Sequence, residues 1–398
     1  MELSRRITGI LGDAEDDGWA VFYRARAMKA AGRAVIELTI GEHDIRTDRS
    51  ILEAMHGAAL AGHTGYAGIP GIPALRDAVA ARVQARTGVP TARGNVLITP
   101  GGQAGLFATH HACGDPGDAA LYVDPAYVTY PGVMRALDLV PVPVSARPED
   151  GFQPREGDLD RAVRAAVRPR SLLINSPNNP TGGVYDRATL EGIARVVTDH
   201  DLWLISDEVY DTQVWEGAHL SPRALPGMAE RTLVIGSMSK SHAMTGSRIG
   251  WIVGPAAAIA RLADLATHTT YGVPGFVQEA ALFALAQGDA LEAEVAAPFA
   301  RRRALALQVL ERQQILRVQP PQGAMYLMLD IRATGLSGEA FAMALLEQHA
   351  IAVMPGESFG TAAAGHVRVA MTVADDLFVA ALERMAGFAA ELAARPPA

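Results

Sequence analysis

The sequence predicts an α/β protein built around a mainly parallel sheet. Short apolar runs recur along the chain, and the stretches between them are long enough for a crossover helix or a loop. Parallel strands are covered by helices on both faces, so short apolar runs that alternate with longer segments are typical of this fold class. The predicted strands are residues 95–99, 119–123, 171–175, 202–206, 232–236 and 250–253.

Length and composition indicate an ordinary globular protein with two domains. A chain of 398 residues exceeds the size at which one hydrophobic core keeps growing. We therefore expect a large domain over residues 42–285, and a smaller domain in which residues 286–398 are joined by the N-terminal segment 1–41. The 49% of hydrophobic residues excludes a disordered chain. The net charge of −8 gives no basic surface for a nucleic acid.

The elements near the two ends of the chain differ from the central alternation. Residues 19–33 predict a helix that ends at Gly32, and residues 35–40 predict a strand. After residue 286 the pattern changes to long helices rich in Ala, Leu and Arg. Strands are predicted there at residues 324–330 and 366–371. These elements make up the predicted smaller domain.

Cysteine usage and the N-terminus indicate a cytoplasmic protein. The single cysteine, Cys113, has no partner for an internal disulfide, so we expect a buried thiol in a reducing compartment. The first ten residues, MELSRRITGI, carry charges where the apolar core of a signal peptide would begin. No stretch reaches about 18 uninterrupted apolar residues, so we expect no membrane partner.

Polar clusters follow the predicted strands at the point where each strand ends. In parallel sheets the loops after the carboxyl ends of the strands open onto a common crevice, where ligands bind. We therefore expect five polar strand ends to converge on one site. These clusters are residues 101–103, 124–130, 175–182, 207–210 and 237–240.

The segment SMSKSHAMTGSRIGW, residues 237–251, is the most informative motif. Lys240 follows a buried strand, where a charged ammonium loses hydration unless it is paired, neutral or covalently used. An isolated lysine of this kind would more often be a solvated loop residue. Here Ser237, Ser239 and Arg248 surround it at spacings that allow two hydroxyls and a guanidinium to bind one phosphate.

This segment resembles the cofactor-lysine signature of the class I and II aminotransferases, the fold-type I pyridoxal-phosphate (PLP) enzymes similar to aspartate aminotransferase. The resemblance covers nearly the whole chain, and its motifs occur in the family's order. It implies that Lys240 holds PLP as a Schiff base while Ser237, Ser239 and Arg248 bind the phosphate. It also implies a large domain with a mainly parallel seven-stranded sheet and a smaller α+β domain.

Two motifs before this segment contribute to the same implied site. In TPGGQAGL a glycine-rich turn opens a helix, and the backbone N–H groups and dipole at a helix N-terminus attract anions. By resemblance, Gly102 and Gln103 bind the cofactor phosphate. In DPAYVTYPG the resemblance places Tyr127 on the face of the pyridine ring. Without the resemblance, an ordinary turn and a core aromatic residue would be the better interpretations.

Two further motifs supply groups for the pyridine ring. NSPNNPTG is an Asn- and Pro-rich turn after an apolar strand, and the resemblance directs Asn179 to the phenolic oxygen of the cofactor. In LISDEVY, Asp207 lies just past a buried strand, where a carboxylate needs a cationic or hydrogen-bonding partner. A protonated pyridine nitrogen would supply that partner, and Tyr210 would share the phenolic oxygen with Asn179.

Two motifs near the ends of the chain point to the substrate. HVRVAMT places Arg368 in an apolar strand with no acidic residue nearby in sequence, which suggests an external carboxylate. The resemblance implies that Arg368, with Asn179 and the backbone of Gly41 in LTIGEHD, binds the substrate α-carboxylate. It also implies that Tyr66 reaches the phosphate held by the other subunit of a homodimer with shared active sites.

Some positions depart from the family pattern. His43 stands where proline is common, and Tyr271–Gly272 stands where a small polar pair is usual. We expect His43 to be structural, and Trp19 and Tyr271 to make the pocket apolar. No arginine is placed by a motif to bind a distal carboxylate, so specificity for aspartate does not follow. No His, Cys, Asp and Glu group has the spacing of a metal site.

These expectations lead to a PLP-dependent aminotransferase that moves an amino group between an L-amino acid and a 2-oxo acid by a ping-pong mechanism. The catalytic residues would be Lys240, Asp207 and Tyr210. The first alternative is a carbon–sulfur β-lyase of the same fold, which would use the same residues. The second is a PLP-responsive regulator, which would need an N-terminal helix-turn-helix and a basic patch, and the sequence has neither.

Overall fold

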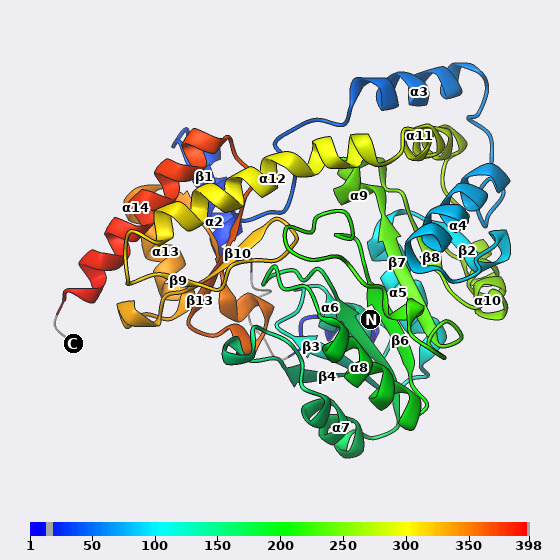
Figure 1. Ribbon diagram of the computed structural model, residues 1–398, viewed down its shortest axis with the longest axis horizontal. Helices are drawn as coiled ribbons and strands as arrows, with labels where there is room; N and C mark the ends of the chain where they lie inside the picture. The colour runs from blue at the N-terminus through cyan, green and yellow to red at the C-terminus, as the bar shows by residue number, and fades with distance from the viewer. Residues whose placement is uncertain (13–18, 396–398) are drawn as a thin grey trace.

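The computed structural model describes residues 1–12 and 19–395 (Figure 1). Its largest element is a seven-stranded sheet in which β8 runs antiparallel to its two neighbours and all other pairs are parallel. The order across the sheet is β2 (Val96–Thr99), β8 (Gly250–Val253), β7 (Thr232–Ser237), β6 (Trp203–Asp207), β5 (Pro169–Asn175), β3 (Ala119–Asp124) and β4 (Val140–Ser145). The predicted fold class is confirmed.

Six of these strands agree with the predicted runs to within two residues at each end. The strand β4 was not predicted. Its sequence, VPVPVS, has proline at two positions and lies at the edge of the sheet, where it pairs only with β3. Proline cannot donate a ladder hydrogen bond and is tolerated on edge strands, so a run of this kind has no clear strand signal.

Helices cover both faces of the sheet, and neighbouring residues of β7 show this. Val234 packs with Val79 and Val277 on one face, whereas Ile235 packs with Leu106 and Leu262 on the other. Successive side chains of a strand point to opposite faces, so a strand buried on both faces is apolar throughout. The helices in this part are α3 (Arg49–Leu60), α4 (Pro73–Thr87), α5 (Gly101–Cys113), α6 (Tyr130–Ala136), α7 (Glu156–Ala165), α8 (Arg187–Asp199), α9 (Met238–Ser241), α10 (Ala256–Thr267) and α11 (Gly275–Ala286).

The rest of the chain forms a second layered part, which the long helix α12 (Asp289–Leu310) connects to the first (Figure 1). Its core contains Phe299, Phe341 and Phe378, which are fully buried. A four-stranded antiparallel sheet runs in the order β12 (Met354–Pro355), β13 (His366–Ala370), β10 (Tyr326–Asp330) and β9 (Arg317–Val318). Helix α13 (Gly338–His349) packs against β12 and β13, and α14 (Asp375–Ala393) packs against α12 and α13.

From helix α2 (Ala20–Ala30) onward the N-terminal segment packs on this second part, whereas the short helix α1 (Arg5–Thr8) before it contacts α6 beside the large sheet. Helix α2 contributes Val21 and Ala25 to the same apolar cluster. The predicted strand over residues 35–40 is shorter than expected: β1 covers only Ile36–Glu37 and pairs in parallel with β11 (Ile351–Ala352). The residues after β1 instead run toward the carboxyl edge of the large sheet, where their backbone makes the contacts described below.

Two general features complete the description. Cys113 is buried and unpaired, and burial raises the pKa of its thiol. In the described part of the chain, no helix has the length and apolar character needed to span a membrane.

Candidate active site

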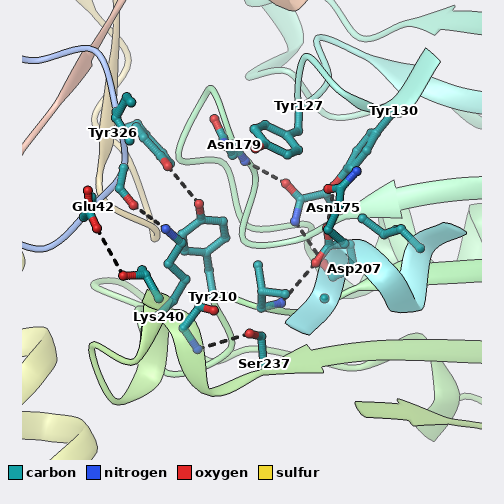
Figure 2. A pocket seen from close by; sticks show the side chains of 18 of the residues that line it. Glu42, Tyr127, Tyr130, Asn175, Asn179, Asp207, Tyr210, Ser237, Lys240 and Tyr326 are labelled. Atoms are coloured by element: carbon teal, nitrogen blue, oxygen red, sulfur yellow. Dashed lines mark hydrogen bonds between the residues drawn. The ribbon is translucent and has the colours of Figure 1, made fainter. Parts of the chain in front are cut away.

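A pocket of about 320 Å³ lies at the carboxyl edge of the large sheet (Figure 2). Both parts of the chain line it, because the N-terminal segment and the strands β10 and β13 approach the ends of β6 and β7 there. Twelve residues that the sequence assigned to the site are among its lining residues: Gly41, Gly102, Gln103, Tyr127, Asn179, Asp207, Tyr210, Ser237, Ser239, Lys240, Arg248 and Arg368. Trp19, which was expected to border the pocket, also lines it.

Lys240 lies in α9, directly after strand β7. Its Nζ donates a hydrogen bond to the carbonyl oxygen of Gly41 and lies 5.9 Å from the ring centre of Tyr210. Burial, together with the positive charges of Arg368 and Arg248, lowers the pKa of Lys240 from 10.5 to about 8, against the opposing charge of Glu42. Near neutral pH a usable fraction of this amine is therefore in the neutral, nucleophilic form.

One end of the pocket is arranged to hold an anion. Gly101 opens helix α5 in a left-handed conformation (φ 78°), and a Cβ at this position would overlap the guanidinium of Arg248. Arg248 is itself left-handed (φ 51°) and donates from Nη1 to the carbonyl oxygen of Thr245 at 2.7 Å. The Ser237 hydroxyl caps α9 by accepting from the backbone N–H of Ser239 at 3.1 Å. A helix N-terminus beside an arginine attracts phosphate.

Asp207 is a buried carboxylate at the end of β6. Its Oδ2 accepts a hydrogen bond from the hydroxyl of Tyr130 at 2.6 Å, and its Oδ1 accepts from the backbone N–H of Val209 at 3.2 Å. Burial raises the pKa of Asp207 from 3.8 to about 6, although these two hydrogen bonds favour the charged form. Across residues 1–12 and 19–395, no cation lies within ion-pair distance of this carboxylate.

Arg368 crosses the pocket from β13. Its guanidinium lies between the rings of Tyr326 and Phe359, with centroid distances of 4.5 and 4.4 Å. Nη1 donates to Oδ1 of Asn179 at 2.8 Å, and Nη2 donates to the carbonyl oxygen of Thr39. The Nε has no hydrogen-bond partner in the structure although it is buried. The guanidinium is therefore fixed in place by neutral groups and keeps its charge available for an anion.

Several lining residues were not predicted from the sequence. The hydroxyls of Tyr210 and Tyr326 lie 2.8 Å apart, and a side chain on Gly41 would overlap the Tyr326 hydroxyl, so the close approach of the N-terminal segment requires glycine. Asn175 donates to the carbonyl oxygen of Asp207 at 2.9 Å and accepts from the Asn179 backbone at 2.8 Å. The other unpredicted lining residues are Ile40, Glu42, Leu106, Tyr130, Val209 and Thr245.

The backbone of the N-terminal segment alternates in the contacts that it makes. The carbonyl oxygens of Leu38 and Ile40 accept hydrogen bonds from the backbone of Ala370 and the hydroxyl of Thr372. The alternate carbonyl oxygens, those of Thr39 and Gly41, accept hydrogen bonds from the side chains of Arg368 and Lys240. One short segment therefore contacts two of the three cations that line the pocket, Arg368 and Lys240, and is itself anchored next to β13.

Tyr66 and Tyr271 lie outside the pocket of their own chain. The Tyr66 side chain is 92% exposed, and its ring contacts Tyr271 edge-on at 5.2 Å. The expectation that Tyr271 lines the pocket is therefore wrong for the single chain, because the Tyr271 ring contacts Tyr66 at the surface. His43 packs on Phe299, and its Nε2 lies 3.0 Å from the carbonyl oxygen of Lys240. Burial lowers the pKa of His43 to about 4.

Comparison with known proteins identifies the family. The family model described as "Aminotransferase class I and II" matches residues 33–385. The chain belongs to the class I and II aminotransferases. Members of this family use PLP. Among the residues that the structure describes, no group of three or more His, Cys, Asp or Glu side chains could hold a metal ion.

Individual relatives agree with this assignment. The chain is 42% identical to an arginine–pyruvate transaminase of Pseudomonas aeruginosa over 94% of this chain and 95% of that protein. It is 37% identical to an aspartate/prephenate aminotransferase of Thermus thermophilus over 96% and 98% of the two chains. A solved aspartate aminotransferase of Thermus thermophilus superposes with a TM-score of 0.90 at 35% identity, covering 97% and 99%. These relatives favour transamination over carbon–sulfur elimination.

Proposed function

We propose that this aminotransferase binds PLP covalently through Lys240 and moves amino groups between L-amino acids and 2-oxo acids. The observation that carries the proposal is the convergence of three groups in one pocket: a buried lysine with a lowered pKa, a buried carboxylate without a cation, and a buried arginine held by neutral partners. Lysine chemistry, pyridine recognition and carboxylate recognition need these three groups together.

The residues of the pocket fit the cofactor. Asp207 is buried as a carboxylate whose described partners are a hydroxyl and a backbone N–H, and a protonated ring nitrogen would supply the missing positive charge. Because Gly101 has no side chain, the Arg248 guanidinium lies against the start of α5, and a positive charge beside a helix N-terminus suits a phosphate. When bound, PLP supplies an electron sink for the negative charge that develops at the substrate Cα.

Each lining residue has a proposed role toward that group. Asp207 would pair with the ring nitrogen, Tyr127 would pack on the ring face, and Asn179 and Tyr210 would donate to the phenolic oxygen. The half-buried Tyr127 ring contacts Tyr130 edge-on at 5.7 Å, which fixes its orientation. The phosphate would be bound by Gly102, Gln103, Ser237, Ser239 and Arg248.

Lys240 also carries the proton that leaves the substrate. Its pKa of about 8 allows the amine to accept a proton from Cα and to return it near neutral pH. The Gly41 carbonyl orients Nζ, and the Tyr210 hydroxyl is held by Tyr326 on the same side of the pocket. These contacts position the base before the substrate arrives, which lowers the entropic cost of proton transfer.

Arg368 determines how the substrate lies. Its planar guanidinium, fixed between two aromatic rings, matches a carboxylate in geometry and charge. We assign the substrate α-carboxylate to Arg368, with Asn179 and the Gly41 backbone beside it. This orientation brings the α-amino group and Cα toward Lys240.

We also propose a homodimer with shared active sites that acts in the cytoplasm, with the domain division at residues 41 and 285. The exposed Tyr66 supports the dimer, because its large aromatic ring lies at the surface, outside the pocket of its own chain. The unpaired Cys113 is compatible with a reducing compartment. The apolar cluster shared by Val21, Leu38 and Phe378 supports the inclusion of the N-terminal segment in the smaller domain.

A panel of amino donors tests the proposal. The PLP-loaded protein is mixed with each L-amino acid without an acceptor, and the conversion of the cofactor absorbance is followed together with the 2-oxo acid that is formed. Transamination predicts one equivalent of oxo acid per site until a second oxo acid is added. Continuous release of pyruvate and ammonia from a cysteine conjugate without any acceptor would instead establish the lyase.

A further inference from the structure

The backbone carbonyl of Lys240 is held by side chains from outside its own helix. Lys240 lies in α9, a helix of only 4 residues, and carbonyl groups at the end of a helix lack intrahelical donors. Across residues 1–12 and 19–395, no backbone N–H donates to the Lys240 carbonyl oxygen. Its hydrogen-bond partners are instead Nε2 of His43 at 3.0 Å and Nε2 of Gln213 at 3.3 Å. These two side chains therefore fix the main chain of Lys240.

His43 acts as the donor in this contact. A carbonyl oxygen only accepts, so the proton of the neutral imidazole lies on Nε2. The other ring nitrogen, Nδ1, is buried and has no hydrogen-bond partner in the described part of the chain. Burial lowers the pKa of His43 from 6.5 to about 4, so near neutral pH the ring adds no positive charge close to Lys240. The ring packs edge-on against Phe299 at a centroid distance of 5.2 Å, which fixes its plane.

The chain just after β1 contacts Lys240 at both of its polar ends. The carbonyl oxygen of Gly41 accepts from Nζ, and His43, two residues later, donates to the Lys240 carbonyl. The next residue, Asp44, accepts two hydrogen bonds from the guanidinium of the buried Arg302 on α12, at 2.9 and 2.6 Å. This part of the chain is thereby anchored to the long helix α12, and the position of Lys240 depends on that anchor.

The two contacts differ in what they require of Lys240. The Gly41 contact uses Nζ itself, so it is given up when Nζ is engaged elsewhere. The His43 contact uses the backbone of the lysine and does not depend on the state of Nζ. His43 stands where proline is common in the family, and a proline side chain has no donor. The contact is therefore a departure of this chain from the family pattern.

We infer that His43 is a positioning residue for Lys240, and that its Nε2–H fixes the lysine backbone so that Nζ returns to one place before each proton transfer. This inference rests on the proposed function and adds a residue to it. A lysine side chain has a long, flexible stem, and a fixed backbone limits the volume that Nζ samples. A base that is already held near the reacting atom loses less entropy when it reacts.

Two substitutions separate this role from packing on Phe299. In His43→Gln the amide nitrogen extends about as far as Nε2 of the imidazole, so the donor is kept while the aromatic ring is lost. In His43→Leu the apolar contact with Phe299 is kept while the donor is lost. Positioning predicts that His43→Gln is the milder change, whereas packing predicts that His43→Leu is. His43→Asn, whose amide is one bond shorter, should behave like the loss of the donor.

The cofactor-free protein reports on Lys240 directly. The chain contains two lysines, so protein labelled with lysine that carries carbon-13 at Cε gives two NMR signals, which Lys29→Gln assigns. The Lys240 signal of the wild type should titrate with a pKa of about 8. In His43→Leu and His43→Asn this pKa should rise by about 0.5–1 unit, because Nζ becomes more hydrated when a hydrogen bond that holds the residue is lost.

Two comparisons complete the titration. His43→Gln should keep the wild-type pKa of Lys240, and so should His110→Leu, which removes a buried imidazole outside the pocket. Denaturant unfolding checks that each variant is folded. If His43→Leu does not fold, the comparison of His43→Asn with His43→Gln decides. A Lys240 pKa that is the same in the variants with and without the donor, or a larger change in His43→Gln than in His43→Leu, would overturn the inference.

The PLP-loaded variants should show the same order in their kinetics. In His43→Leu, kcat should fall about two- to tenfold, as for the loss of one hydrogen bond. The deuterium isotope effect at the substrate Cα should rise, while the KM for amino donors should stay, because Arg368 is unchanged. If no amino acid changes the cofactor absorbance in the wild type, the proposed function fails, and the lysine titration of the cofactor-free protein still decides on His43.

Discussion

The hydroxyl of Tyr130 donates a hydrogen bond to Oδ2 of Asp207 at 2.6 Å, and both side chains are buried. Tyr130 is the first residue of α6, three residues after Tyr127. The hydrogen bond favours the charged form of Asp207 against the effect of burial. Tyr130 is therefore a positioning residue, since it acts on the proposed ring-nitrogen partner and not on the substrate.

Tyr130→Phe should raise the pKa of Asp207 further. Loss of a hydrogen bond to a charged group costs roughly 1.5–3 kcal/mol, which corresponds to about one to two pKa units. The pH at which the absorbance of the bound cofactor changes should shift accordingly. Tyr185→Phe, which removes another buried tyrosine hydroxyl outside the pocket, is the control. An unchanged pH profile in Tyr130→Phe would show that the hydrogen bond has no electrostatic effect.

Asp207→Asn should stabilise the cofactor-free protein while it impairs catalysis. The folded-state pKa of Asp207 is raised from 3.8 to about 6, so the folded protein binds its proton more tightly than the unfolded chain does. The ionised carboxylate therefore destabilises the fold by an amount that grows as the pH rises from about 3.8 to about 6 and is constant above. This amount is on the order of 3 kcal/mol.

Denaturant unfolding of the cofactor-free wild-type protein and Asp207→Asn at pH 8 and at pH 4 tests this predicted gain in stability. The gain in the free energy of unfolding should be present at pH 8 and nearly absent at pH 4. Turnover of the PLP-loaded variant should fall by orders of magnitude, because a neutral amide does not keep the ring nitrogen protonated. A variant that is less stable at pH 8, or that turns over at the parent rate, would contradict the placement of Asp207.

Borohydride reduction should attach the cofactor to Lys240 alone. The sequence contains two lysines, so the peptide map has two possible outcomes. Lys29 lies on α2, forms an ion pair with Glu37 at 2.9 Å and is not among the residues that line the pocket. Lys29→Gln should retain the label and Lys240→Ala should lose it. Cofactor found on the Lys29 peptide would refute the assignment.

Arg368→Lys should weaken substrate binding much more than cofactor binding. Lysine keeps the positive charge but loses the planar fork that is fixed between Tyr326 and Phe359. The KM for amino donors should rise about 10- to 100-fold, as for the loss of a charged hydrogen bond. The absorbance of the bound cofactor should remain. Arg332→Lys, at an exposed arginine, serves as the control, and unchanged kinetics for every donor in Arg368→Lys would exclude the role.

Tyr66→Phe should weaken cofactor binding without dissociating the proposed dimer. The ring would still contact Tyr271, whereas the hydrogen bond to the partner's phosphate would be lost, which raises the dissociation constant of PLP by about tenfold or more. Sedimentation velocity reports the assembly, and fluorescence titration reports the affinity. Tyr271→Phe should leave that affinity unchanged. An active monomer at assay concentrations would rule out shared active sites.

The sequence predicted the fold and most of the pocket. Burying a polar or charged group at a strand end costs free energy unless the group has a partner, so such residues point to a binding site. Asp207, Lys240 and Arg368 stand out in apolar surroundings, and all three line one pocket. Tyr66 could not be placed in this way, because its proposed partner belongs to a second chain.

The missed residues carry weaker signals. Tyr326 lies in a predicted core strand, and its ring packs there while only its hydroxyl enters the pocket. Tyr130 likewise resembles a core aromatic residue in sequence. The contacts of Thr39 and Gly41 use backbone carbonyls, which every residue possesses, so no side-chain pattern could reveal them. The strand β4 was missed because of its two prolines.

The alternation of carbonyl contacts after β1 makes the site sensitive to chain length. The carbonyl oxygens of Leu38 and Ile40 point to one side of the segment, and those of Thr39 and Gly41 point to the other. A one-residue deletion between β1 and Gly41 would exchange these two sides while the pairing of β1 with β11 could persist. Substitutions in this segment would then be tolerated far better than insertions or deletions, because these backbone contacts depend on the number of residues in the segment and not on their side chains.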